Sequence, residues 1–186
     1  MCIKGEGSAG CPAGWPALHL DNMRVVCPGS FDPVTNGHLD IFTRAAAQWD
    51  EVIVLVTYNP NKNGLFNEQE RVALIEAAIA DLPEERRPKN IRIDTWDRLL
   101  VDYLTENNIS ALVKGLRSSL DYEYELPMAQ MNQRLSGADT YFLLTSPDYG
   151  YVSSTLCKEV AKYGGDVSGL LPEPVAEAVK AKFAES

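Results

Sequence analysis

The sequence predicts a single doubly wound α/β domain built on a parallel sheet of five strands. Its 186 residues suit one domain. From residue 23 onward, short runs rich in β-branched residues alternate with helical patterns. The run Val52–Val56 is apolar throughout, as expected for a parallel strand that helices cover on both faces. This alternation is typical of βαβ units, so ligands are expected beyond the carboxyl ends of the strands.

Five short segments are predicted as the strands of this sheet. The first ends at a Pro-Gly pair, and in the third apolar residues alternate with polar ones, which favours a position near a sheet edge. The predicted strands are Val25–Cys27, Val52–Val56, Ile91–Ile93, Ala111–Val113 and Tyr141–Leu144.

Four segments show the spacing of amphipathic helices. In the first, apolar residues recur at i, i+3, i+7 and i+10, and the second repeats this spacing. Asn67, with Glu70 three residues later, gives the second helix an N-cap. Gly164 ends the last helix. The predicted helices are residues 39–49, 72–82, 99–104 and 156–163.

Composition and charge limit the classes of function. Lys and Arg number 17 and Asp and Glu number 26, so the net charge is −9. Such a protein repels polyanions, which excludes general nucleic-acid binding but allows small anionic substrates where cations gather. No run approaches the roughly 18 apolar residues of a membrane span, so no membrane partner is expected. The four cysteines form no C-x-x-C pair, which favours a reducing, cytoplasmic location.

Residues 1–22 are predicted to be an extension outside the domain, which then spans residues 23–186. The extension is rich in Gly, Pro and Ala and shows no periodicity, so we expect it to be disordered. Gly5, Gly7 and Gly10 spell G-x-G-x-x-G, but this motif binds a pyrophosphate only between a strand and a helix. Because no strand precedes these glycines, a dinucleotide site is not expected there.

The loop after the first predicted strand, residues 28–38, runs directly into the first predicted helix. Its glycines allow the backbone to approach a ligand, and the free N–H groups and dipole at a helix start favour an anion such as phosphate. His38 lies in the first helical turn, where an imidazole can donate to a phosphoryl oxygen as charge develops on it. A lone histidine at a helix start is more often an ordinary polar residue, but this loop favours a functional role.

Four separated motifs follow one another along the chain. The first is Thr-Asn-Gly-His at residues 35–38, within GSFDPVTNGHLDI. The others are KGLR at 114–117, DYEYE at 121–125, and VSST at 152–155 followed by KEV at 158–160. The first fits the T/H-x-G-H signature of nucleotidylyltransferases, and the set resembles more closely, in the same order, the motifs of the phosphopantetheine adenylyltransferase family. The resemblance runs from Met23 to the C-terminus and implies a Rossmann-like nucleotidylyltransferase fold.

The resemblance implies a reaction. AMP is transferred from ATP to 4'-phosphopantetheine, which gives dephospho-coenzyme A and pyrophosphate; Mg²⁺ is expected with ATP and coenzyme A as a feedback ligand. Phosphate is already a nucleophile at neutral pH, so direct in-line attack needs no covalent enzyme intermediate. Catalysis is then mainly positioning and charge stabilisation.

Three residues receive roles at the reacting centre from the resemblance. Ser30 and His38 contact the reacting phosphates, and His38 stabilises the pentavalent α-phosphorus. Lys62 holds the attacking phosphate of phosphopantetheine as a mobile point charge. Composition alone would favour a solvated loop lysine at position 62.

Lys114 and Arg117 follow the fourth predicted strand and place two cations at a strand end in an acidic protein. The resemblance implies that Lys114 binds the acceptor substrate and that Arg117 is catalytic. The alternative is a surface ion pair with Asp121 or Glu123. Many family members carry Arg at position 114, so a bidentate phosphate contact is lost there while the charge remains.

The resemblance also implies the walls of the two substrate sites. Leu100 would line the pantetheine arm, although a core leucine looks identical in sequence. Hydroxyls at 153–155, at an expected helix start, would face phosphate oxygens. The residues implied to bind ATP are Ser30, Phe31, His38, Gly115, Leu116, Arg117, Glu125, Tyr149, Gly150, Tyr151, Val152, Ser153, Ser154 and Thr155.

Two further departures from the family pattern affect the ATP site. Gly150 replaces a commoner Ser and removes one donor. Pro127 replaces a commoner Gln; inside a helix it would remove a backbone hydrogen bond, push Leu126 out of the helical region and disturb Glu125.

An apolar segment, Tyr122–Leu135, is predicted to lie at a subunit contact beside the ATP site. It holds more apolar surface than one helix stripe can bury inside its own domain, of side-chain types enriched at interfaces. With the resemblance, this predicts a closed homo-oligomer, a hexamer. The apolar residues are Tyr122, Tyr124, Leu126, Met128, Met131 and Leu135.

Two other functions compete with this reading. One is a nucleotidylyltransferase that acts on nicotinate mononucleotide or a small alcohol phosphate, against which Lys62 and the KGLR motif argue. The other is a catalytically silent nucleotide-binding domain of the same fold. The intact Ser30, His38, Lys62 and Arg117 argue against it.

Overall fold

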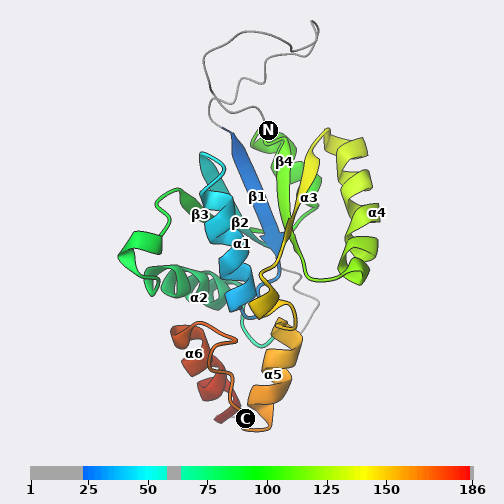
Figure 1. Cartoon of the computed structure of the whole chain (residues 1–186). Helices are drawn as coiled ribbons and strands as arrows, with labels where there is room; N and C mark the ends of the chain where they lie inside the picture. The colour runs from blue at the N-terminus through cyan, green and yellow to red at the C-terminus, as the bar shows by residue number, and fades with distance from the viewer. Residues whose placement is uncertain (1–22, 58–63, 185–186) are drawn as a thin grey trace, which may run out of the picture.

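The computed structural model of the chain describes residues 23–57 and 64–184. All five predicted strands are present and form one parallel sheet of order β3-β2-β1-β4-β5 (Figure 1). The predicted fold class is confirmed, and the strand predicted near an edge, β3, is an edge strand. The strands are β1 (Arg24–Gly29), β2 (Glu51–Thr57), β3 (Ile91–Trp96), β4 (Ala111–Leu116) and β5 (Asp139–Leu144).

The four predicted helices are also present, with small differences at their ends. Trp49 lies beyond the end of its helix, and Leu99 is an N-cap. Helices α4 and α6 were not among the four predicted from the spacing of apolar residues. The helices are α1 (Asn36–Ala46), α2 (Glu68–Ala80), α3 (Leu100–Glu106), α4 (Ser119–Ser136), α5 (Ser154–Lys162) and α6 (Glu173–Ala184).

The sheet separates two apolar cores, because alternate residues of a strand face opposite sides. Val25 and Cys27 of β1 belong to the larger core, together with residues of α1, α2, α5 and α6. Val26 belongs to the smaller core, together with residues of α3. In Figure 1, α5 and α6 lie beyond the carboxyl ends of the strands and α4 stands beside β5. The carboxyl edge of the sheet is therefore enclosed from several sides.

Helix α4 corrects the expectation for Pro127. The helix runs unbroken through Pro127, and Leu126 stays helical. Pro127 and Glu123, the residue four positions earlier, are both exposed. Water can then bond the carbonyl that loses its partner, which lowers the cost of proline inside a helix.

Two further expectations concern the ends of the chain and membranes. The predicted extension, residues 1–22, lies outside the described residues. None of the helices in the described ranges is both long and apolar enough to cross a membrane.

Candidate active site

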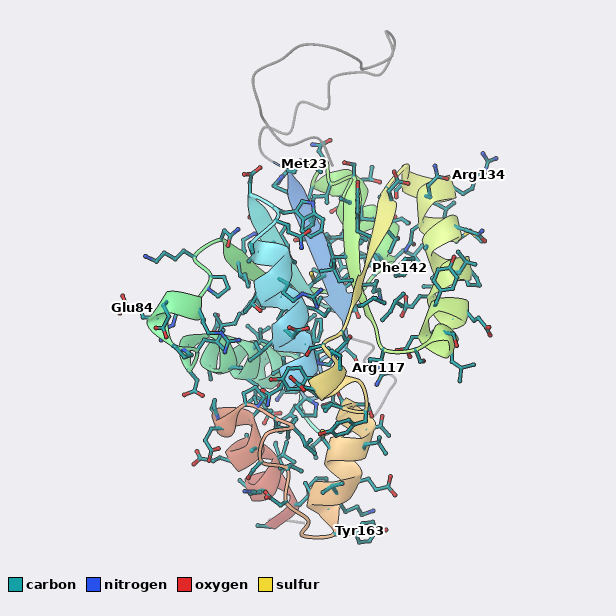
Figure 2. The ribbon with its side chains drawn as sticks, in the orientation of Figure 1. Met23, Glu84, Arg117, Arg134, Phe142 and Tyr163 are labelled. Atoms are coloured by element: carbon teal, nitrogen blue, oxygen red, sulfur yellow. The ribbon has the colours of Figure 1, made fainter. Side chains whose placement is uncertain are left out.

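A cavity of about 410 Å³ opens at the carboxyl edge of the sheet. The loop after β1, the first turn of α1, the end of β4, the first turns of α4 and the start of α5 line it. Arg117, labelled in Figure 2, marks this region between β4 and α5. Strand β1 pairs with β2 on one side and β4 on the other, so the cavity lies at the point where the strand order reverses. Ligands of open α/β sheets bind at this point.

Most of the predicted site residues line this cavity. Lys62 lies outside the described residues, and Leu100, Leu116 and the segment 149–151 are not part of the lining. The predicted residues in the lining are Ser30, Phe31, His38, Lys114, Gly115, Arg117, Glu125, Val152, Ser153, Ser154 and Thr155.

The loop after β1 folds so that Phe31 supports the ring of His38. Phe31 adopts a left-handed backbone conformation, with φ +45°, and its ring meets His38 edge to face at 5.1 Å between centroids. A Cβ on Gly29 would lie 2.6 Å from Phe31 Cζ, so this packing requires glycine at position 29. Residues in this backbone region are uncommon and cluster at functional sites.

His38 is held at the start of α1 by a capping box. The backbone N–H of Thr35 donates to His38 Nδ1 at 3.0 Å, while Thr35 Oγ1 accepts from the backbone N–H of His38 at 3.4 Å. Because Nδ1 accepts a hydrogen bond, the proton of the neutral ring is on Nε2. The imidazole therefore has one donor left, and His38 is part of the cavity lining.

The surroundings of His38 keep it neutral. Burial, and then the positive charges of Arg117 and Lys114, lower the pKa of His38 to about 4. A protonated ring would place two donors face to face at Nδ1 and the Thr35 N–H. At neutral pH, His38 is thus an uncharged donor beside two permanent cations.

Each of the two cations is paired with a carboxylate on α4. Lys114 Nζ lies 3.3 Å from Glu125 Oε2. Arg117 donates from Nε and Nη2 to Asp121, both at 3.0 Å, and from Nη1 to the Val152 carbonyl at 3.2 Å. The predicted alternative, an Arg117–Asp121 pair, is therefore present. All four charged side chains line the cavity, so the pairs occupy the site itself.

The start of α5 uses two of its three hydroxyls inside the protein. Ser153 is the N-cap, and its Oγ accepts from the backbone N–H of Leu156 at 3.2 Å. Ser154 Oγ donates to the Pro33 carbonyl at 2.7 Å. Thr155 is exposed in the lining. Ser153 and Thr155 therefore keep an O–H donor for a ligand, whereas the O–H of Ser154 is used inside the protein, and the helix start faces the cavity.

The other predicted wall residues have mainly structural positions. Leu116 is buried, with 8% of its surface exposed, and Tyr149 packs on the larger core. Gly150 is half-buried, and Tyr151 is exposed to solvent. Leu100 packs on the smaller core, which is the core role that its sequence also allowed.

The cavity also contains residues that sequence reasoning missed. Thr145 follows β5 directly, and a polar residue after a predicted strand is the pattern that could have identified it. Tyr124 lies in the lining, one residue before Glu125. Cys27 lines the cavity too, but burial raises the pKa of its thiol to about 12. The thiol stays protonated and is a poor nucleophile.

The fold and the cavity agree with comparisons to known proteins. A family model described as cytidylyltransferase-like matches residues 26–160. A solved structure described as a nicotinate-nucleotide adenylyltransferase from Vibrio parahaemolyticus has a TM-score of 0.64 at 16% identity, and the match covers 89% of this chain and 97% of that one. At this identity the likeness shows the fold alone. The family model spans most of the chain, so the chain belongs to the cytidylyltransferase-like family.

The curated relatives give the family within this class. Phosphopantetheine adenylyltransferase of Corynebacterium efficiens is 69% identical over 164 residues, which are 88% of this chain and 99% of the relative. The protein of the same name from Corynebacterium diphtheriae is 62% identical over 86% of this chain and 97% of its own. The chain belongs to the phosphopantetheine adenylyltransferase family. The predicted resemblance is confirmed.

Proposed function

We propose that this enzyme transfers the adenylyl group of ATP to 4'-phosphopantetheine and produces dephospho-coenzyme A and pyrophosphate. The observation that carries the proposal is the neutral, Nε2-protonated His38 at the start of α1, beside Lys114 and Arg117 in one cavity. Relatives that are 62–69% identical over nearly their whole length carry the name of this activity.

The polyphosphate of ATP is assigned to the space between the starts of α1 and α5. Helix starts offer free N–H groups and a positive dipole end, which favour an anion. Arg117 adds a positive charge for ATP once it exchanges Asp121 for phosphate oxygens, and Lys114 adds one for the acceptor phosphate once it exchanges Glu125. Both ion pairs are partly exposed, and such pairs are worth only about 0–1 kcal/mol, so phosphate groups can displace them.

The chemical step is a single in-line displacement. An oxygen of the acceptor phosphate forms a bond to the α-phosphorus of ATP, while the bond from that phosphorus to the α,β-bridging oxygen breaks and pyrophosphate leaves. His38 donates from Nε2 to an α-phosphoryl oxygen as negative charge builds on it. No protein nucleophile is required, and the protonated thiol of Cys27 offers none.

Mg²⁺ is proposed to enter with ATP and to be held mainly by phosphate oxygens. Mg²⁺ commonly keeps several waters and binds through phosphates plus one or two carboxylates. In the described ranges no group of three or more His, Cys, Asp or Glu side chains could hold a metal ion alone. Asp121 and Glu125, once released by Arg117 and Lys114, are carboxylates in the lining that could contribute to such a site.

The acceptor phosphate is proposed to bind Lys114, which lines the cavity, and Lys62, which lies outside the described residues. Coenzyme A is proposed as a feedback ligand, because it shares the pantetheine and adenylate parts of the product. Competition between coenzyme A and ATP in the forward reaction tests this; inhibition that ATP does not relieve would reject a shared site. The buried free thiols of Cys27 and Cys157 suit a cytoplasmic location.

A homohexamer is proposed from the surface of α4. Five apolar residues form one stripe with spacing 4, 4, 3 and 4 along the helix, and their exposed fractions run from 56% to 78%. Two residues of the predicted set lie outside this stripe. The ring of Tyr122, which is 42% exposed, lies 5.6 Å from that of Phe142 on β5, labelled in Figure 2, and Leu126 is half-buried. The stripe consists of Leu120, Tyr124, Met128, Met131 and Leu135.

Product analysis by mass spectrometry tests the proposed function against its nearest rival. The purified chain is incubated with ATP, Mg²⁺ and either 4'-phosphopantetheine or nicotinate mononucleotide. Dephospho-coenzyme A is expected in the first reaction, and no dinucleotide is expected in the second. Nicotinate adenine dinucleotide formed at a comparable rate would assign the chain to the rival activity, and no product with either acceptor would favour a silent domain.

A further inference from the structure

Asp32 lies in the loop that connects β1 to α1, between Ser30 and His38, but it is not part of the cavity lining. It is buried, with 7% of its surface exposed. Its carboxylate accepts from the backbone N–H groups of Leu65 (3.0 Å) and Phe66 (2.9 Å) and from Lys158 Nζ (2.9 Å). Burial alone would raise the pKa of Asp32, but these hydrogen bonds outweigh it and lower the pKa. Asp32 is therefore an ionised and well-satisfied buried carboxylate.

Arg71 is the second buried charge of this cluster. Its Nε lies 3.6 Å from Asp32 Oδ1 and donates to the Phe66 carbonyl at 2.8 Å, and its Nη1 donates to the Ser30 carbonyl at 3.1 Å. A Cβ on Gly64 would collide with the guanidinium, so the backbone can cover Arg71 closely only because residue 64 is glycine. Arg71 thus connects the backbone of Ser30, a cavity residue, to Asp32.

Helix α5 reaches the same loop through two contacts. Lys158 forms the ion pair with Asp32, and the hydroxyl of Ser154 donates to the carbonyl of Pro33, the next residue of the loop. Residues 153–155 at the start of this helix line the cavity. The Asp32 cluster therefore determines where the start of α5 lies relative to the start of α1.

This relative placement matters for an anion. The favourable field of a helix start falls off within the first turn, so two helix starts act on one polyphosphate only when both are close to it. We propose that Asp32 is a positioning residue for ATP: it holds Ser30 and the start of α5 in register with the start of α1. This inference rests on the proposed function for the identity of the anion.

Because Asp32 is negatively charged, a positioning role and a purely electrostatic role predict opposite effects on ATP binding when the charge is removed. A carboxylate repels a nearby polyphosphate, so Asp32→Asn would strengthen ATP binding if Asp32 acted only through its field. A positioning role predicts that Asp32→Asn weakens ATP binding. A merely structural role would lower the melting temperature and leave the Kd of the folded molecules for ATP unchanged.

Calorimetric titration with ATP and Mg²⁺ tests the proposal on the full chain. Asp32→Asn is expected to raise the Kd for ATP about tenfold or more at a temperature where circular dichroism shows the variant folded. An unchanged or lower Kd would overturn the proposal. Wild-type protein that binds ATP but makes no dephospho-coenzyme A would refute the proposed acceptor and leave this comparison of affinities intact.

Lys158→Gln provides a second test if Asp32→Asn does not fold. The lost charge of Lys158 weakens ATP binding by its field as well, but salt near 1 M screens that effect over about 3 Å. A several-fold rise in Kd that persists at high salt is expected. The matched control is Lys162→Gln on the same helix, where the ammonium lies over the ring of Tyr163. A Lys158→Gln affinity equal to that of the control at high salt would overturn the proposal.

Discussion

Two walls of the cavity are built in opposite ways. The wall formed by the loop after β1 and the start of α5 is held by buried charges and backbone hydrogen bonds around Asp32. The wall formed by α4 has no buried residue and reaches the cations of the site through two partly exposed ion pairs. The first wall is preorganised before a ligand arrives, whereas the second can exchange partners. Charge that develops in a transition state is stabilised best by groups that need not reorganise.

The largest effect is expected from His38 in the preorganised wall. His38→Ala should lower kcat on the order of 100-fold or more, because a donor used mainly in the transition state contributes little to substrate binding. Steady-state kinetics with both substrates varied gives kcat and KM separately. A kcat within a few-fold of wild type would remove His38 from the chemical step.

The same histidine makes the folding stability of the protein depend on pH. The pKa of His38 is about 4 in the folded protein and about 6.5 in an unfolded chain, so the unfolded state takes up the proton first as pH falls. The part of the free energy of unfolding that comes from keeping His38 neutral is fully present above about pH 6.5 and is lost towards pH 4. It falls by about 2 kcal/mol between pH 7.5 and pH 5. Urea unfolding at both pH values, with His38→Gln as reference, measures it. An equal pH dependence in the two proteins would show that His38 is not held neutral.

Lys62, which the resemblance assigns to the acceptor phosphate, tests the acceptor side separately from the two walls. Lys62→Ala should weaken 4'-phosphopantetheine about tenfold and leave ATP nearly unchanged, because removal of one charge-assisted contact costs about 1.5–3 kcal/mol. Calorimetry with each ligand alone gives both affinities. Equal losses for the two ligands would show that the role assigned to Lys62 is wrong.

The exchangeable wall should matter more for assembly than for chemistry. Wild-type protein is expected near six times the chain mass of 20.5 kDa in multi-angle light scattering at micromolar concentration. Met131→Asp with Leu135→Asp places two charges on the exposed stripe and should reduce the mass. Gln133→Asp, exposed on the same helix but outside the stripe, is the control. A wild-type particle near the mass of one chain would overturn the hexamer.

The smallest effect is expected from the removal of residues 1–22, which the sequence predicts to lie outside the domain. A chain that begins at Met23 should keep kcat and both KM values within about twofold and melt at a similar temperature, because the removed segment carries no periodic pattern and none of the family motifs. An insoluble or inactive truncation would contradict this prediction.

The sequence predicted the preorganised wall better than the exchangeable one. The strands and the start of α1 follow from local apolar runs and a local capping pattern, so Val52–Val56 and His38 were found directly. The Arg117–Asp121 pair is local and was named as an alternative, but the Lys114–Glu125 pair joins residues 11 positions apart and depends on how α4 docks on β4. Pro127 misled the prediction because its cost depends on exposure to water, a tertiary property. The contacts of Asp32 were missed for a similar reason, since their partners lie 33 to 126 residues away.

The central claim is a direct transfer of the adenylyl group to the acceptor in a preorganised site. The most direct test is the release of pyrophosphate from ATP, followed from the first turnover, with and without 4'-phosphopantetheine. Release is expected only with the acceptor, in equal amount to dephospho-coenzyme A and with no burst in its absence. Release that is equal in both cases, or a burst equal to the enzyme concentration without acceptor, would contradict the direct transfer.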